Sequence, residues 1–164
     1  MGPEPETCGA LLRPVRTLLG IKHMAMTRGN AFSDASLPDA AAGLLGELVH
    51  NGESRASDLA AYRFVDASVI SRQLSQLEHS GLIARRPDPA DGRVSLLRAT
   101  QEGEQQLGEL ERRKSEWLSR ALSDWDDHDV RALAELLHTA ATDIRRAMQD
   151  EAEESGHSTT KGTR

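Results

Sequence analysis

Hydrophobic positions recur every three or four residues over most of this chain, which is the spacing of amphipathic helices. Between residues 82 and 98 the pattern changes to two short apolar runs around the turn-forming stretch PDPADG, which predicts a β-hairpin with a long loop. The expected elements, in chain order, are helices 9–28, 38–51, 57–62 and 66–80, strands 82–86 and 94–98, and helices 101–122 and 127–150. The expected fold class is therefore mainly α, of the α+β type.

The stretch DASVISRQLSQLEHS, residues 66–80, predicts one helix with two different faces. Asp66 is expected to cap its N-terminus, because the carboxylate can accept hydrogen bonds from the free N–H groups of the first turn. Gly81 follows the helix and can adopt the left-handed conformation that often ends one. Helical spacing places an apolar stripe on the side of the core, made of Ile70, Leu74 and Leu77.

The opposite face of the 66–80 helix is polar, with small side chains and one cation. It consists of Ser68, Arg72, Ser75 and His79. A packed back and a short-side-chain, arginine-bearing front favour insertion into a DNA major groove. A solvated surface helix is the alternative interpretation of the same pattern.

The neighbouring segments favour the DNA interpretation. The short helix 57–62 precedes the 66–80 helix across a tight turn, which is typical of a helix-turn-helix. The hairpin 82–98 is a candidate wing, with Arg93 at the far end of its loop. Residues 55–98 hold seven arginines against five acids, a local net charge of +2, although the whole chain carries −6. For a protein that binds DNA through one surface, this local distribution of charge matters more than the sum.

Composition limits the class of protein. Only five of the 164 residues are aromatic, so the core is expected to consist of Leu, Ala and Val in packed helices. No apolar run approaches the roughly 20 residues that a membrane span needs, and we expect no association with a membrane. The single cysteine, Cys8, cannot form an internal disulfide, so a reducing cytoplasm is the expected compartment.

Signatures of catalysis and of metal binding are missing from the sequence. The chain has no Walker-type phosphate loop, no GxSxG, no HExxH and no GxGxxG motif. None of the six histidines stands at ligand spacing with Cys or Glu partners. We therefore expect no catalytic residues, no metal site and no cofactor.

The order of the elements resembles the MarR (multiple antibiotic resistance regulator) family. The resemblance is carried by VDASVISRQLSQLEHSGLIARRPDPADGRVSLLRAT, residues 65–100, in which GLIARRPDPADGR is close to the family's wing. It implies a MarR-type domain over 9–150, with a winged helix-turn-helix at 37–100 and dimerisation helices at 9–30 and 101–150. The flanking residues 1–8 and 151–164 are expected to be disordered, because they are polar and hold few apolar side chains.

The resemblance also implies which residues contact DNA. Ser68 and Arg72 match positions that face base edges. Arg93 matches a wing-tip arginine that enters the minor groove and that Asp91 holds by a charge-assisted pair. Arg55 stands where family members commonly have a Ser or Thr helix cap, and we expect it to touch phosphate. The candidate DNA-binding residues are Arg55, Ala67, Ser68, Ser71, Arg72, Gln73, Gln76, Arg86, Asp91 and Arg93.

The first and last helices supply more apolar length than a winged domain of roughly 60 residues needs, which favours a homodimer. Closure of an intramolecular bundle is the alternative. The candidate interface residues are Leu11, Val15, Leu18, Leu133, Leu137 and Ile144.

These observations lead to two hypotheses about function. The first is a cytoplasmic, homodimeric transcription regulator, a repressor rather than an activator, that binds a pseudo-palindromic site on double-stranded DNA. The resemblance adds a small-molecule effector that releases it. The second hypothesis is a winged-helix module that binds protein and has no specific affinity for DNA.

Overall fold

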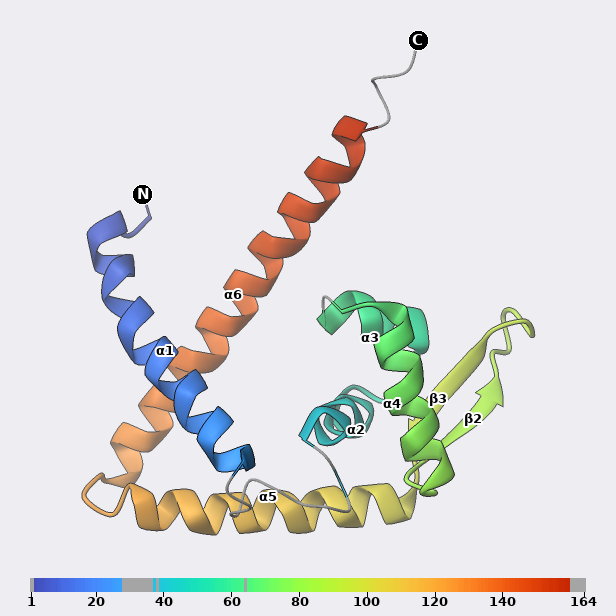
Figure 1. The fold of residues 1–164 in the computed structure, drawn as a ribbon, viewed down its shortest axis with the longest axis horizontal. Coiled ribbons are helices and arrows are strands. Elements are labelled where there is room, and N and C mark those ends of the chain that lie inside the picture. Colours follow the sequence, from blue (N-terminus) through green and yellow to red (C-terminus); the bar gives the residue numbers. More distant parts are fainter. Residues whose placement is uncertain (1, 28–36, 38, 64, 160–164) are drawn as a thin grey trace. The chain divides into compact units, whose positions relative to one another are not determined.

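A computed structural model describes residues 2–27, 37, 39–63 and 65–159 of the chain. The expected loop at 29–36, the turn residue Phe64 and the last five residues lie outside this set. The chain divides into two compact units, residues 1–118 and 119–164. The elements are α1 (Pro5–Thr27), α2 (Asp39–Asn51), β1 (Ser54–Arg55), α3 (Ala56–Arg63), α4 (Ala67–His79), β2 (Ile83–Pro87), β3 (Ser95–Ala99), α5 (Gln101–Ala121) and α6 (Asp127–Thr159) (Figure 1).

The hydrophobic core of the first unit lies where α2, α3, α4, the sheet and the first half of α5 meet. As the periodicity predicts, the apolar stripe of α4 is buried there, and Ile70, Leu74 and Leu77 are each at most 2% exposed. The other side chains with almost no exposed surface are Leu44, Leu45, Leu82, Leu97 and Leu110. The core is built almost entirely of leucine and alanine, which agrees with the small number of aromatic residues.

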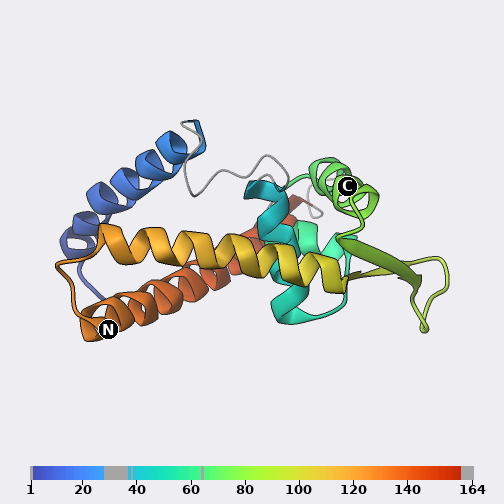
Figure 2. The ribbon, with the colours of Figure 1, turned by 90° about the horizontal axis from the view of Figure 1, so that it is seen from below.

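The predicted hairpin is confirmed, with each strand one residue later than expected. β2 and β3 pair in antiparallel register from Ile83 opposite Ala99 to Pro87 opposite Ser95. Seen from below, the hairpin extends away from α4 and from the start of α5 as a wing (Figure 2). A third strand, β1, was not predicted. It pairs with β3, so that the strand order in the sheet is β1-β3-β2.

The wing and α5 are joined through Thr100. Its hydroxyl accepts the N–H of Gly103 at 3.1 Å, which caps the N-terminus of α5, and donates to the carbonyl of Gly81 at 2.7 Å. Its own N–H donates to the carbonyl of Leu82 at 3.0 Å. Gly81 has φ +72°, the left-handed conformation expected after α4. One threonine therefore ties the end of the recognition-type helix to the start of the long helix.

Three expectations about helix ends were wrong. Asp66 is the N-cap residue of α4, but its side chain makes no capping hydrogen bond, and only its carbonyl accepts from the first turn. α1 begins at Pro5 rather than at Gly9, since proline is favoured in a first helical turn and Glu6 suits the positive end of the helix. α6 continues to Thr159 rather than ending near 150, because the glutamates that follow are good helix formers.

The second unit consists of the end of α5 and α6. The carboxylate of Asp126 accepts the N–H of Asp129 at 2.8 Å and so caps α6. In the described part of the chain, no helix is both long enough and apolar enough to cross a membrane.

Candidate nucleic-acid interface

The outer face of α4 is exposed along its whole length. Ala67, Ser68, Ser71, Arg72 and Gln76 are all exposed, and Gln73 is half-buried at the edge of this face. The hydroxyl of Ser75 donates a hydrogen bond to the carbonyl of Ser71 at 2.9 Å, one turn earlier on the same helix. Ser68, Ser71 and Arg72 are therefore the exposed polar side chains in the N-terminal half of α4, where a recognition helix contacts bases.

The loop of the wing is closed by backbone hydrogen bonds. The N–H of Asp88 donates to the carbonyl of Val94 at 2.9 Å, and the N–H of Val94 donates to the carbonyl of Asp91 at the same distance. The carboxylate of Asp91 accepts the backbone N–H of Arg93 at 3.0 Å. The expected ion pair between Asp91 and the guanidinium of Arg93 is absent among the described residues. Asp91 shapes the turn, and the Arg93 side chain projects from it.

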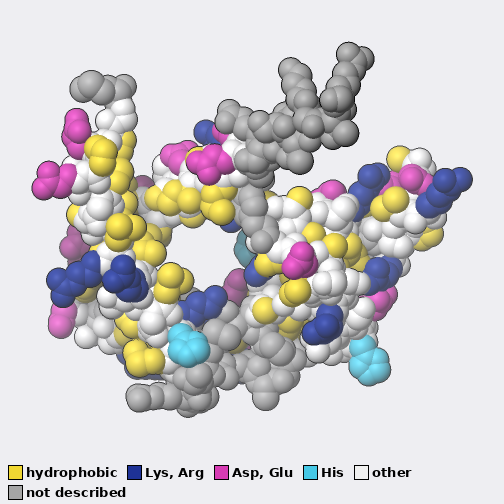
Figure 3. Space-filling model, turned by 45° about the horizontal axis from the view of Figure 1, so that its top comes forward, with side chains coloured by type: hydrophobic (Ala, Val, Ile, Leu, Met, Phe, Trp, Pro, Cys, Tyr) yellow, Lys and Arg dark blue, Asp and Glu magenta, His cyan; other side chains and the backbone are white. Residues whose placement is uncertain are grey.

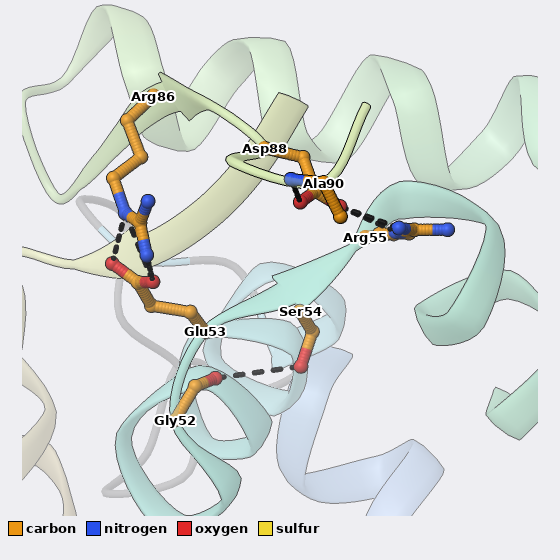
Figure 4. A network of polar contacts seen from close by, with 7 residues as sticks. All are labelled: Gly52, Glu53, Ser54, Arg55, Arg86, Asp88 and Ala90. Atoms are coloured by element: carbon orange, nitrogen blue, oxygen red, sulfur yellow. Dashed lines mark hydrogen bonds and ion pairs between the residues drawn. The ribbon is translucent and has the colours of Figure 1, made fainter. Parts of the chain in front are cut away.

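A network of ion pairs links the segment around β1 to the wing (Figure 4). One oxygen of Asp88 accepts from Nε of Arg55 at 3.0 Å and from Nη2 at 2.5 Å, while the other accepts the N–H of Ala90 at 2.8 Å. Arg86 forms a forked pair with both carboxylate oxygens of Glu53. Two candidate DNA-binding residues, Arg55 and Arg86, are thus already engaged with acids of the same chain.

These contacts shift the pKa values of both acids. The N–H of Ala90 and the guanidinium of Arg55 lower the pKa of Asp88 below its ordinary value. The hydrogen bond from Arg86 lowers the pKa of Glu53 in the same way. Both acids are therefore held in their charged form, and each balances the positive charge of its arginine partner.

The arginines of the winged region divide into two groups. Arg55, Arg63, Arg85 and Arg86 form ion pairs with Asp88, Glu47, Glu78 and Glu53 respectively. The side chains of Arg72 on α4, of Arg93 on the wing loop and of Arg98 on β3 form no hydrogen bond or ion pair with any residue that the structure describes. Basic side chains are visible on the wing at the right of Figure 3. Arg72 and Arg93, which the sequence places on the DNA-facing elements, are therefore among the arginines left available to an outside anion.

The predicted interface residues are exposed within their own units. Leu11, Val15 and Leu18 lie on α1, and Leu133, Leu137 and Ile144 lie on α6. All six are among the exposed large hydrophobic side chains, with Ile144 at 60%. Hydrophobic side chains are visible along α1 in Figure 3.

Sequence reasoning missed four features of this site. They are β1, the buried acid Asp88, the exposed acid Glu53 and the close packing of Gly103. A weak signal for the first was available in the sequence, since Ser54 and Arg55 follow Asn51-Gly52, a turn-forming pair at the end of α2. The described residues contain no cluster of three or more His, Cys, Asp or Glu side chains that could hold a metal ion.

A family model described as "MarR family" matches residues 35–94. The uncharacterized HTH-type transcriptional regulator YdgJ of Bacillus subtilis is 29% identical over 77% of this chain and 72% of its own length. Regulator YxaD of the same organism is 37% identical over 57% of this chain and 66% of its own. The HTH-type transcriptional repressor IacR of Pseudomonas putida is 28% identical over 55% of this chain and 54% of its own length.

The fold of the chain is also similar to that of a solved MarR family structure. The structure of a MarR family protein from Bacillus stearothermophilus superposes with a TM-score of 0.70 at 16% identity, over 87% of this chain and 99% of that one. The family model's match, residues 35–94, contains α4, β2 and the loop of the wing, on which Arg72 and Arg93 are exposed, and it ends just before β3. Over these residues the chain therefore matches the MarR family of winged helix-turn-helix transcriptional regulators.

Proposed function

We propose that this protein represses transcription by binding a pseudo-palindromic DNA site as a homodimer. The observation that carries the proposal is the division of the arginines. Arg55, Arg63, Arg85 and Arg86 form ion pairs with acids of the chain, whereas the side chains of Arg72 and Arg93, like that of Arg98 on β3, have no partner among the described residues. An unpaired arginine keeps its full attraction for a phosphate or a base edge.

Each half of the site would be read in two grooves. α4 enters the major groove, where Arg72 can donate two hydrogen bonds to guanine and Ser68 can contact a base or a phosphate. The wing follows the backbone so that Arg93 reaches the minor groove, whose negative potential rises where it is narrow. Asp91 supports this position through the backbone of Arg93 rather than through its side chain.

Homodimerisation is supported by the exposed apolar side chains of α1 and α6. Leu136, Leu137 and Ile144 are respectively 70%, 49% and 60% exposed, which is unfavourable in water unless a partner covers them. A two-fold dimer places two copies of α4 about 34 Å apart, one turn of DNA. The pseudo-palindromic site follows from this symmetry.

A small-molecule effector has a candidate site in the first unit. A cavity of about 350 Å³ is bordered by Lys22 of α1, by Gly43 and Gly46 of α2, and by the α5 side chains Leu107, Leu110, Glu111 and Lys114. Arg63 at its wall is paired with Glu47, but Lys22 and Lys114 outnumber Glu111 there, and this balance favours a small anion. A bound molecule would contact the dimer helix α1 and the winged region at once, and so bias the spacing of the two α4 helices.

The repressor role is taken from the relative IacR, which carries that description. A protein that occupies a promoter site blocks access to it, and release by an effector restores transcription. Such a role requires no catalytic step and places the protein in the cytoplasm, with the chromosome.

The DNA-binding proposal is tested by selecting duplexes from a random library with the full-length protein. We expect a two-fold symmetric consensus, and binding whose log affinity falls linearly with log salt concentration. Arg72→Ala should lower affinity for the selected duplex by about 1–3 kcal/mol and leave binding to random DNA almost unchanged. Arg131→Ala, which removes an exposed arginine of the second unit, is the matched control and should bind like wild type. A library that yields no consensus would leave the protein-interaction module as the better hypothesis.

A further inference from the structure

Asp88 differs from every other charged residue in the described part of the chain because it is buried. Only 7% of its surface is exposed, and its two carboxylate oxygens accept three hydrogen bonds from Arg55 and Ala90. Arg55, its partner, is 33 residues away in the sequence. A buried carboxylate with this complete set of donors has a fixed position and fixes the groups around it.

The Arg55–Asp88 pair joins the helix-turn-helix to the wing. Arg55 ends β1 and directly precedes α3, whereas Asp88 directly follows β2 and begins the wing loop. β3 lies between these two strands in the sheet, so β1 and β2 make no backbone contact with each other. The side-chain pair therefore spans β3 and provides the connection that the sheet does not (Figure 4).

The same residue controls where the loop carries Arg93. The N–H of Asp88 and the carbonyl of Val94 close the base of the loop at 2.9 Å, and Arg93 immediately precedes Val94. The carboxylate of Asp88 also binds the N–H of Ala90 inside the loop. Rotation of Asp88 would therefore move the segment that holds Arg93.

We propose that Asp88, held by Arg55, is a positioning residue for Arg93, and that this ion pair sets the distance between the wing and the α4 helix before DNA binds. The inference rests on the proposed DNA-binding function. It changes the role of Arg55 from a phosphate contact to a structural partner of the wing. A wing oriented in advance avoids the cost of ordering it during binding, and it presents Arg93 and Arg72 to the two grooves together.

The exposed Glu53–Arg86 pair provides a matched comparison. It spans the same two segments, but its partners remain 32% and 44% exposed. Exposed pairs contribute little because water competes for both charges. Loss of the Glu53 charge should therefore leave wing orientation almost unchanged, whereas loss of the Asp88 charge should not.

The test uses two duplexes that share one selected core and differ in the flanks that the wing reaches, A·T-rich in one and G·C-rich in the other. The readout is the ratio of affinities for the two duplexes, in which the fraction of folded protein cancels. Wild type should prefer the A·T flanks, whose minor groove is narrow. Asp88→Asn and Arg55→Ala should each reduce the preference by roughly threefold to tenfold, and Glu53→Gln should retain it.

A double-mutant cycle then shows whether Asp88 acts through Arg93. Arg93→Ala should abolish the flank preference. Adding Asp88→Asn to Arg93→Ala should change the ratio of affinities no further, because Asp88 affects this ratio only through the position of the Arg93 side chain. The inference is overturned if Asp88→Asn keeps the wild-type ratio, or if its effect adds to that of Arg93→Ala. Selection of no consensus by wild type would instead refute the proposed function itself.

Discussion

Gly103 is the position where a single methyl group should do the most damage. It lies in the first turn of α5 and is buried against Leu82 and Leu45. A Cβ at this position would lie 2.1 Å from the carbonyl oxygen of Leu82 and 3.1 Å from Cδ1 of Leu45. The oxygen belongs to the backbone and already accepts the N–H of Thr100 at 3.0 Å, so it cannot turn away without loss of that bond.

The expected effect of Gly103→Ala is a loss of about 3 kcal/mol in the free energy of unfolding. Overpacking a core costs about 1–3 kcal/mol, and the full range applies here because backbone must move. Loss of the Thr100 hydrogen bond adds about 1 kcal/mol. The higher helix propensity of alanine offsets roughly 1 kcal/mol of this loss in the free energy of unfolding. The balance is opposite in sign to the usual effect of replacing glycine in a helix.

Gly108 is the matched control, because it lies in the same helix and a Cβ there would meet nothing within 4 Å. Gly108→Ala should stabilise the protein by up to about 1 kcal/mol. Urea unfolding followed by circular dichroism, at one fixed protein concentration, compares the two variants. If Gly103→Ala unfolds at the same urea concentration as wild type, α5 is not seated on Leu82 as described.

Two further results are expected. Leu137→Glu on α6 should convert the dimer into a monomer in light scattering, because it puts a charge on an exposed apolar stripe. The control is Thr142→Glu, which lies about 140° from Leu137 around the axis of the same helix and should leave the mass unchanged. The free energy of unfolding should fall as pH drops below about 4, because the pKa values of Asp88 and Glu53 are lowered in the folded state and the unfolded chain takes up protons first. Asp88→Asn should lose less stability than wild type between about pH 6 and about pH 3, and an equal loss would contradict the assignment of Asp88 as a charged, paired group.

The local chain pattern was sufficient to predict the elements of the DNA-binding region. α4 was predictable because Ile70, Leu74 and Leu77 repeat with the period of a helix, and burial on one face is all that this pattern requires. The wing was predictable because its turn-forming residues lie between two short apolar runs. The exposed positions of Ser68 and Arg72 followed from the same periodicity, since a helix with one buried stripe has only one opposite face.

Contacts between distant segments were not predictable in the same way. β1 has two residues and no pattern of its own, and it exists as a strand because β3 offers it backbone partners. Arg55 looked like a cation for phosphate because its acid, Asp88, is 33 residues away. The expected pair of Asp91 with the Arg93 side chain was wrong because a carboxylate near a turn binds backbone N–H groups readily.

The sequence by itself determined that a polar, arginine-bearing helix and a wing stand side by side along the chain, since both depend on spacing within short segments. Only the tertiary structure decided which arginines are neutralised and which remain available. That decision depends on contacts between elements, because the acids of the segment around β1, of the wing loop, of α2 and of α4 are brought to arginines on other elements. The sequence shows that each arginine is positively charged. How strongly that arginine attracts DNA depends on whether an acid from another part of the fold already balances its charge.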